Sequence, residues 1–153
     1  MADKLQFDLI AAHKVFSADN FNKTWEYIGG SERSQEDNLA MLHTAIASLW
    51  HWSQRGDATA KNLSVGYWQV SRVFSLIRQP DNARMYGLLS LKHAEMLEPF
   101  YQGYAYESLA RAEMIANNRV VMKHYLEKAH EMASMVADEE DKRVLLKDLE
   151  TIK

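Results

Sequence analysis

Residues 67–94 read YWQVSRVFSLIRQPDNARMYGLLSLKHA, and residues 106–133 read YESLARAEMIANNRVVMKHYLEKAHEMA. The second stretch repeats the first weakly, at a constant offset in residue number. The matching pairs are Tyr67 and Tyr106, Val70 and Leu109, Ser71 and Ala110, Arg72 and Arg111, Leu76 and Ile115, Ala83 and Met122, Tyr86 and Tyr125, and Ala94 and Ala133. Each copy predicts one helix, a tight turn and a second helix, because apolar residues recur at helical spacing on both sides of a turn. A repeat of this length is typical of stacked helical pairs.

The rest of the chain has the same helical periodicity. We expect about seven helices in antiparallel hairpins, and the apolar stripes, which polar or glycine-rich breaks separate, mark eight candidate segments for them. In the N-terminal part, one helix is expected over 5–16, a second begins at Asp19 or Asn20 and ends at Gly29, and a third begins at Asp37 or Asn38. The remaining helices are expected over 58–77, 83–97, 104–116, 120–136 and 138–152.

Length and composition predict one all-α domain. The chain has 153 residues, of which 47% are hydrophobic and 25% charged, and it contains only two prolines and six glycines. These values suit a globular protein with long uninterrupted helices. We therefore assign residues 1–153 to a single domain, with repeats over 58–136 and capping helices over 1–30 and 138–153.

Charge and cysteine content narrow the classes of partner. The net charge of −3 and the pI near 6.1 argue against a nucleic-acid partner, which normally meets a basic face. The absence of cysteine excludes disulfides and thiolate metal sites, and it fits a cytoplasmic location. The first residues resemble no signal peptide, and their apolar run is too short for a bilayer, so no membrane partner is expected.

The order of residues in the second copy resembles the tetratricopeptide repeat. Tyr106, Leu109 and Ala110 precede a turn at 117–118, and three residues for helix packing follow it, which are Met122, Leu126 and Ala129. The first copy offers Tyr67, Val70 and Ser71, a turn at 78–79, and then Ala83, Gly87 and Ser90. The resemblance covers 58–136 and implies a right-handed superhelix that binds proteins or peptides. The spacing is longer than the period of that family, which is about 34 residues, Asn117 replaces the usual turn glycine, and 98–103 is a candidate insertion.

A segment rich in aromatic and histidine residues, 43–52, is the first candidate site. His43, Ala47, Trp50 and His51 share one helical face, distinct from the apolar stripe of the same helix. In one interpretation this face lines a groove together with Trp68 and Arg72 of the following helix, because aromatic residues and arginine dominate binding hot spots. In the other, which is the more common situation, the tryptophans belong to the core.

The arginines and the tyrosine cluster also have two interpretations each. Arg72 and Arg111 could bind an anionic peptide or a carboxylate terminus, but an ordinary surface ion pair between Arg111 and Glu107 is the favoured hypothesis. Around Gly103 lies a cluster of aromatic rings that either faces a ligand or, as we favour, seals the junction between two hairpins. Its members are Phe100, Tyr101, Tyr104 and Tyr106.

Catalytic motifs are absent from the sequence, which has no GxSxG, no glycine-rich phosphate loop and no GxGxxG. We predict a protein- or peptide-binding module without catalytic residues, cofactor or metal, and homodimerisation is a further hypothesis. The predicted binding residues are His43, Trp50, His51, Trp68, Arg72, Tyr106 and Arg111. The alternatives are a small-molecule or peptide sensor with an enclosed aromatic pocket, and a DinB-like enzyme that holds a metal through three histidines. For that enzyme the available histidines are His43, His51, His93, His124 and His130.

Overall fold

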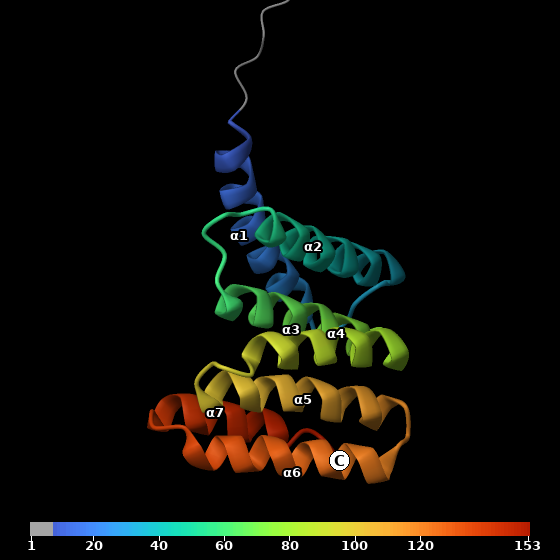
Figure 1. The fold of residues 1–153 in the computed structure, drawn as a ribbon. Helices are drawn as coiled ribbons and strands as arrows, with labels where there is room; N and C mark the ends of the chain where they lie inside the picture. Colours follow the sequence, from blue (N-terminus) through green and yellow to red (C-terminus); the bar gives the residue numbers. More distant parts are fainter. Residues whose placement is uncertain (1–7) are drawn as a thin grey trace, which may run out of the picture.

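The computed structural model describes residues 8–153 and contains seven helices in this range, with no strand. They are α1 (Leu9–Ile28), α2 (Gln35–Ser53), α3 (Ala60–Leu76), α4 (Pro80–Ala94), α5 (Pro99–Ile115), α6 (Arg119–Met135) and α7 (Glu139–Leu149). The all-α prediction is confirmed. Consecutive helices pack as the pairs α1–α2, α3–α4 and α5–α6, and α7 lies against α5 and α6 (Figure 1). No helix within the described range is both long and apolar enough to cross a bilayer.

The weak sequence repeat is a regular structural repeat. The number of residues from the start of α3 to the start of α5 equals the number from the start of α4 to the start of α6. Both numbers equal the offset of the sequence repeat. The turn inside each pair is built in the same way, because Arg78 and Asn117 adopt left-handed backbone angles, with φ of 61° and 59°. In both copies the next amide donates to a carbonyl five residues back, at 2.9 Å. Asn117 thus closes its helix as glycine often does, since asparagine tolerates this conformation.

The prediction of two separate helices before Gly29 is wrong, because α1 runs without a break from Leu9 to Ile28. Asn20 lies inside α1, where its side-chain amide donates to the carbonyl of Phe16 at 2.8 Å. Thr24 similarly donates to the carbonyl of Asn20 at 2.8 Å. These polar side chains bond to the preceding turn of the helix instead of capping a new one.

Three further helix starts lie clearly earlier than the sequence pattern predicts, and one of them is that of α4, which begins at Pro80 and not at Ala83. Ser34 caps α2, and Asp37 completes a capping box with it, so Asp37 occupies the third helical position and does not open the helix. Pro99 is the first residue of α5, a position where its missing amide hydrogen costs no hydrogen bond. Residues 99–103 are therefore the beginning of α5 and not a loop between two helices.

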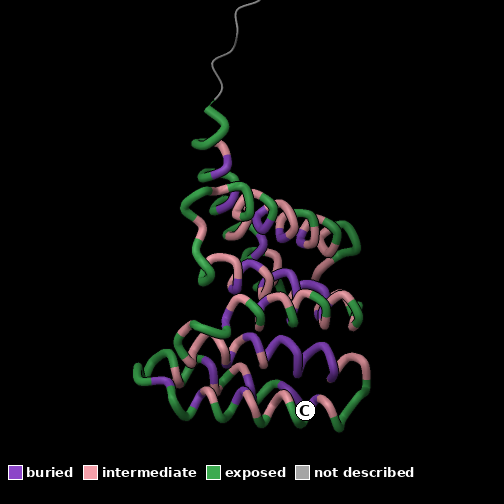
Figure 2. Tube along the Cα trace, viewed as in Figure 1, coloured by how far each residue is buried: buried purple, intermediate pink, exposed green. Residues whose placement is uncertain are grey.

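Helix α5 lies between the α3–α4 pair and helices α6 and α7, and its residues are buried along much of its length (Figures 1 and 2). Two groups of buried apolar side chains flank it. One lies mainly under α2 and α3 and includes Met41 and Val70, and the other joins α6 and α7 and includes Met122 and Leu145. Buried polar residues accompany them on α5, namely Glu107, Ser108, Arg111 and Glu113. The most enclosed helix thus carries charged groups.

Gly103→Val is expected to lower the free energy of unfolding by about 1–3 kcal/mol, the usual result of overpacking a core. A Cβ atom at Gly103 would lie 2.6 Å from Cδ2 of Leu145, which is fully buried, so one of the two side chains must shift within the core. The measurement is chemical denaturation followed by circular dichroism. Gly56→Val is the matched control, because nothing lies within 4 Å of its added Cβ atom. Equal losses in both variants would contradict the prediction.

Candidate functional site

A groove crosses α1, α3, α5 and α7. It consists of two hollows, of about 310 Å³ and about 260 Å³, that share Val65 and Tyr101 as lining residues. Together they are lined by seven aromatic side chains, which are Phe21, Trp25, Trp52, Trp68, Phe100, Tyr101 and Tyr104. We call this feature the aromatic groove. The larger hollow reaches the lower end of the size range of small-molecule sites, and the smaller hollow lies beside it.

Trp68 lies at the centre of the rings in the larger hollow. Its ring centroid is 5.6 Å from that of Trp25 and 5.4 Å from that of Tyr104. Phe100 lies 5.1 Å from Tyr104. The planes of Trp68 and Phe100 each meet that of Tyr104 at 76°, the edge-to-face arrangement that aromatic pairs favour. The planes of Trp25 and Trp68, by contrast, are inclined at only 33°.

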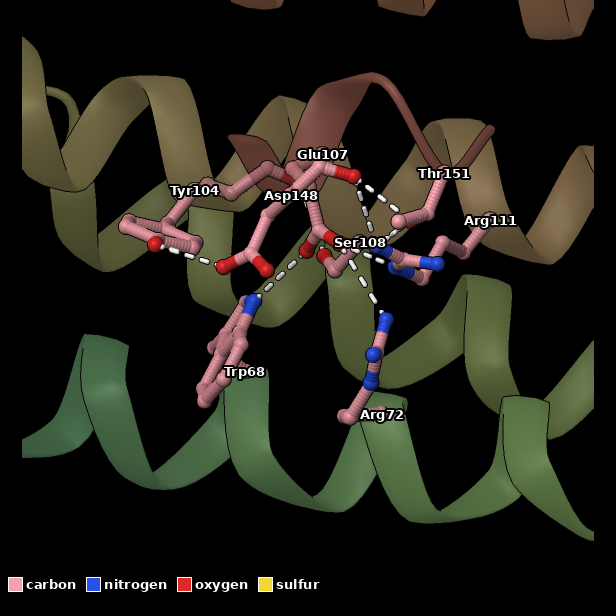
Figure 3. A network of polar contacts seen from close by, with 9 residues as sticks. Trp68, Arg72, Tyr104, Glu107, Ser108, Arg111, Asp148 and Thr151 are labelled. Carbon is pink, nitrogen blue, oxygen red and sulfur yellow. Dashed lines mark hydrogen bonds and ion pairs between the residues drawn. The ribbon is translucent and has the colours of Figure 1, made fainter. Parts of the chain in front are cut away.

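Beneath the rings, Glu107 is the centre of a buried polar network (Figure 3). Its carboxylate accepts hydrogen bonds from Nε1 of Trp68 at 2.9 Å and from a guanidinium nitrogen of Arg72 at 3.3 Å, and it forms an ion pair with Arg111. Arg111 also donates to the backbone carbonyl of Asp148 at 2.9 Å. The network therefore joins α3, α5 and the C-terminal end of α7 under the aromatic groove.

The network connects equivalent positions of the repeat. Trp68 corresponds to Glu107, and Arg72 corresponds to Arg111, at the same offset as the other matching pairs. The second copy has a carboxylate where the first has an indole, and this carboxylate accepts the indole N–H of the first copy. Because both arginines reach the same Glu107 side chain, the two hairpins are joined by one shared counter-ion.

Burial shifts the pKa values of two groups at the site. Burial raises the pKa of Glu107 to about 7, and the nearby Asp148 adds to this rise, whereas Arg72 and Trp68 oppose it. Burial also raises the pKa of Tyr104, and so does its hydrogen bond to a carboxylate oxygen of Asp148, at 2.7 Å. Tyr104 therefore stays protonated at neutral pH and donates to Asp148, which holds the ring in place.

Three of the predicted binding residues meet at this network. Trp68 borders the aromatic groove, Arg72 reaches Glu107 from α3, and Arg111 is only 6% exposed. The predicted ion pair between Arg111 and Glu107 is confirmed, but its predicted place on the surface is wrong, because both side chains are buried. A spacing of four residues predicts that two side chains meet, and it does not reveal which helix covers them.

Trp50 and His51 lie elsewhere, at the C-terminal end of α2. Their rings contact His13 of α1, whose Nδ1 lies 2.8 Å from Nδ1 of His51. Burial lowers the pKa of His51, and so does the neighbouring His13. The structure therefore does not bring Trp50 and His51 together with Trp68 and Arg72.

The two other predicted residues also lie outside the aromatic groove. His43 is exposed on α2, and the ring of Tyr106 stacks on Tyr125 of α6, with centroids 6.3 Å apart. The tyrosine cluster is thus divided. Phe100, Tyr101 and Tyr104 line the groove, whereas Tyr106 lies between α5 and α6.

Sequence reasoning missed Trp25, Glu107 and Asp148 as site residues. Trp25 and Asp148 come from α1 and α7, outside the repeated segment, so no repeat pattern connects them with Trp68. For Glu107 a signal was present, since it replaces a tryptophan at an equivalent position of the repeat. A charged residue at a position that is aromatic in the other copy indicates that the two equivalent side chains have different neighbours in the folded chain.

Comparison of the chain with protein-family models, curated proteins and solved structures found no match. Within residues 8–153, no three histidine, cysteine, aspartate or glutamate side chains lie close enough together to hold a metal ion.

Proposed function

We propose that the chain is a binding module for an extended peptide segment of a partner protein, and that the aromatic groove is the binding site. The observation that carries the proposal is the continuous row of aromatic side chains across α1, α3 and α5. Aromatic residues are enriched in the centres of protein interfaces, where they supply much of the binding free energy. The resemblance to tetratricopeptide repeats supports the same function, since stacked helical pairs present extended concave surfaces.

The shape and charge of the groove favour a peptide over a compact ligand. The two hollows share a wall, so the combined space is elongated. Lys61 borders the smaller hollow and Asp148 the larger one, so the two hollows carry opposite charges. A peptide with complementary charges along its length fits this arrangement better than a small uniform molecule, because each end finds an opposite charge.

The buried network supports the proposal by fixing the rings before a ligand arrives. Trp68 is held by Glu107, and Tyr104 is held by Asp148. Each side chain that is already ordered avoids an entropy loss of about 0.5–1.5 kcal/mol on binding. Affinity in the groove therefore rests on preorganised rings and not on newly ordered loops.

Trp25→Ala is expected to weaken peptide binding at least tenfold, because truncation of a hot-spot residue typically costs about 2 kcal/mol or more. The peptides are selected from a random phage-displayed library on the wild-type chain, and their affinities are then measured by calorimetry. Trp25 is 41% exposed at the rim of the groove, so its removal leaves the core unchanged.

Trp50→Ala is the matched control, since Trp50 is a 54% exposed tryptophan at the far end of α2. It should bind the selected peptides as the wild type does. If Trp50→Ala loses binding while Trp25→Ala keeps it, the site lies beside His13 and not in the aromatic groove. A failure to enrich any peptide would contradict the proposed function itself.

A further inference from the structure

The Asp148 end of the aromatic groove combines aromatic rings with one carboxylate. We propose that this end binds the methylated ammonium group of a lysine side chain in the bound peptide. We call it the aromatic box and define it by Trp25, Trp68, Phe100, Tyr104 and Asp148, all of which border the larger hollow. The inference rests on the proposed function, because it names the side chain that the groove recognises.

The rings of the aromatic box suit a cation. Trp25 and Trp68 supply indole rings, which attract cations more strongly than other aromatic side chains. They come from α1 and α3, whereas Phe100 and Tyr104 come from α5, so the rings approach one cavity from three helices. The centroids of neighbouring rings lie 5.1–5.6 Å apart. An ammonium group in this cavity contacts more than one ring, and the attractions add.

Asp148 supplies the negative charge. One of its carboxylate oxygens accepts the hydroxyl of Tyr104, and within residues 8–153 no lysine or arginine side chain forms an ion pair with its carboxylate. Glu107, by contrast, already pairs with two arginines. The carboxylate of Asp148 therefore meets a cationic ligand without first giving up an ion pair.

The cavity wall, which is mainly apolar with four hydroxyl groups and one carboxylate, favours a methylated ammonium. An unmodified lysine carries three N–H donors, and each donor that is buried without an acceptor costs binding free energy. Apart from Asp148, the polar groups of the wall include Ser64 and Ser90, whose hydroxyls donate to each other's backbone carbonyls. A trimethylated ammonium keeps its charge and has no donor to satisfy.

The other end of the groove provides an internal comparison. Nζ of Lys61 lies 4.8 Å from the centroid of the Tyr101 ring, so one ring of the groove already holds a cation. The charge of Lys61 repels a second cation from the smaller hollow. A cationic side chain of the peptide is therefore directed to the Asp148 end.

The test uses three capped pentapeptides that differ only in the central residue of a chain of alanines. This residue is trimethyllysine, unmodified lysine, or the uncharged isostere in which carbon replaces the trimethylated nitrogen. Binding is followed by NMR through the indole N–H resonances of Trp25 and Trp68. We expect the trimethyllysine peptide to bind at least tenfold more tightly than the isostere and more tightly than the lysine peptide.

Asp148→Asn should reduce the preference for the trimethyllysine peptide over the isostere to less than threefold. Asparagine keeps an acceptor for the Tyr104 hydroxyl, so the cavity retains its shape. Glu150→Gln is the matched control, because it removes an exposed carboxylate two residues away that does not border the larger hollow. This variant should bind all three peptides as the wild type does.

Equal affinity for trimethyllysine and its isostere would overturn the inference, and so would tighter binding of unmodified lysine. The two proposals fail separately. If library peptides bind in a Trp25-dependent manner but the trimethyllysine peptide does not bind, the aromatic box is refuted and the peptide-binding function stands. If the trimethyllysine peptide binds in the box but no library peptide is enriched, binding of unmodified peptides is refuted, and the groove binds only peptides that carry the methylated side chain.

Discussion

Glu107→Ala is expected to lower the free energy of unfolding by about 3–5 kcal/mol, the range observed when one partner of a buried ion pair is removed. The variant leaves the guanidinium group of Arg111, which is only 6% exposed, without the carboxyl oxygen that accepts its Nε–H, an acceptor that Glu107 offers in its neutral form as well as in its ionised form. It also removes the acceptor of the Trp68 indole N–H. Urea denaturation at pH 8, followed by far-UV circular dichroism, measures the loss.

Glu26→Ala is the control for this prediction. Its carboxylate pairs with Lys23 on the surface of α1, where both side chains are more than half exposed. A surface pair of this kind contributes about 0–1 kcal/mol, so the variant should unfold almost as the wild type does. If the two variants lose the same stability, the network around Glu107 is not the buried anchor that the structure indicates.

The second prediction concerns pH. Ionisation of Glu107 should lower the free energy of unfolding by roughly 3 kcal/mol between about pH 4.5 and pH 7, since one pKa unit corresponds to about 1.36 kcal/mol. The folded pKa is about 7 and the ordinary value is 4.5, so the folded chain binds more protons than the unfolded chain in this window. Stability falls with rising pH wherever the folded state holds more protons.

The measurement compares the wild type with Glu107→Gln at several pH values. Glutamine keeps an acceptor for Trp68 and cannot ionise, so the difference between the two stability curves isolates the carboxyl group. Other acids then cancel, including Asp57, whose pKa is lowered to about 2 by its hydrogen bond from Arg55. Parallel curves, or a wild-type curve that rises relative to the variant from pH 4.5 to 7, would contradict the prediction.

The repeat made the middle of the fold predictable. Helices α3 to α6 follow directly from two copies of one pattern, and the two turns lie where the sequence breaks the periodicity. The errors lie at helix starts. Asn20 and Pro99 are residue types that commonly begin a helix or end one, and the choice between these roles depends on which hydrogen-bond partner each finds in the folded chain.

The candidate site was only partly predictable. Trp68, Arg72 and Arg111 were predicted from the sequence because tryptophan and arginine dominate binding hot spots and because arginine binds anionic groups. Trp25 and Asp148 reach the same cavity through contacts between helices that are far apart in the sequence, and helical periodicity contains no information on such contacts. The same limit explains why Trp50 was predicted beside Trp68 but lies elsewhere. The sequence shows which face of a helix a side chain is on, and it does not show which other helix packs against that face.

The regular stacking of α3, α5 and α7 determines which side chains of a bound peptide would contact the groove. Adjacent packed helices lie about 8–10 Å apart, whereas an extended chain advances about 3.3 Å per residue and a polyproline II chain about 3.1 Å. A peptide that crosses these helices at right angles therefore meets a new helix after about three residues. Its recognition motif would have a period of three, with the intervening side chains free to vary.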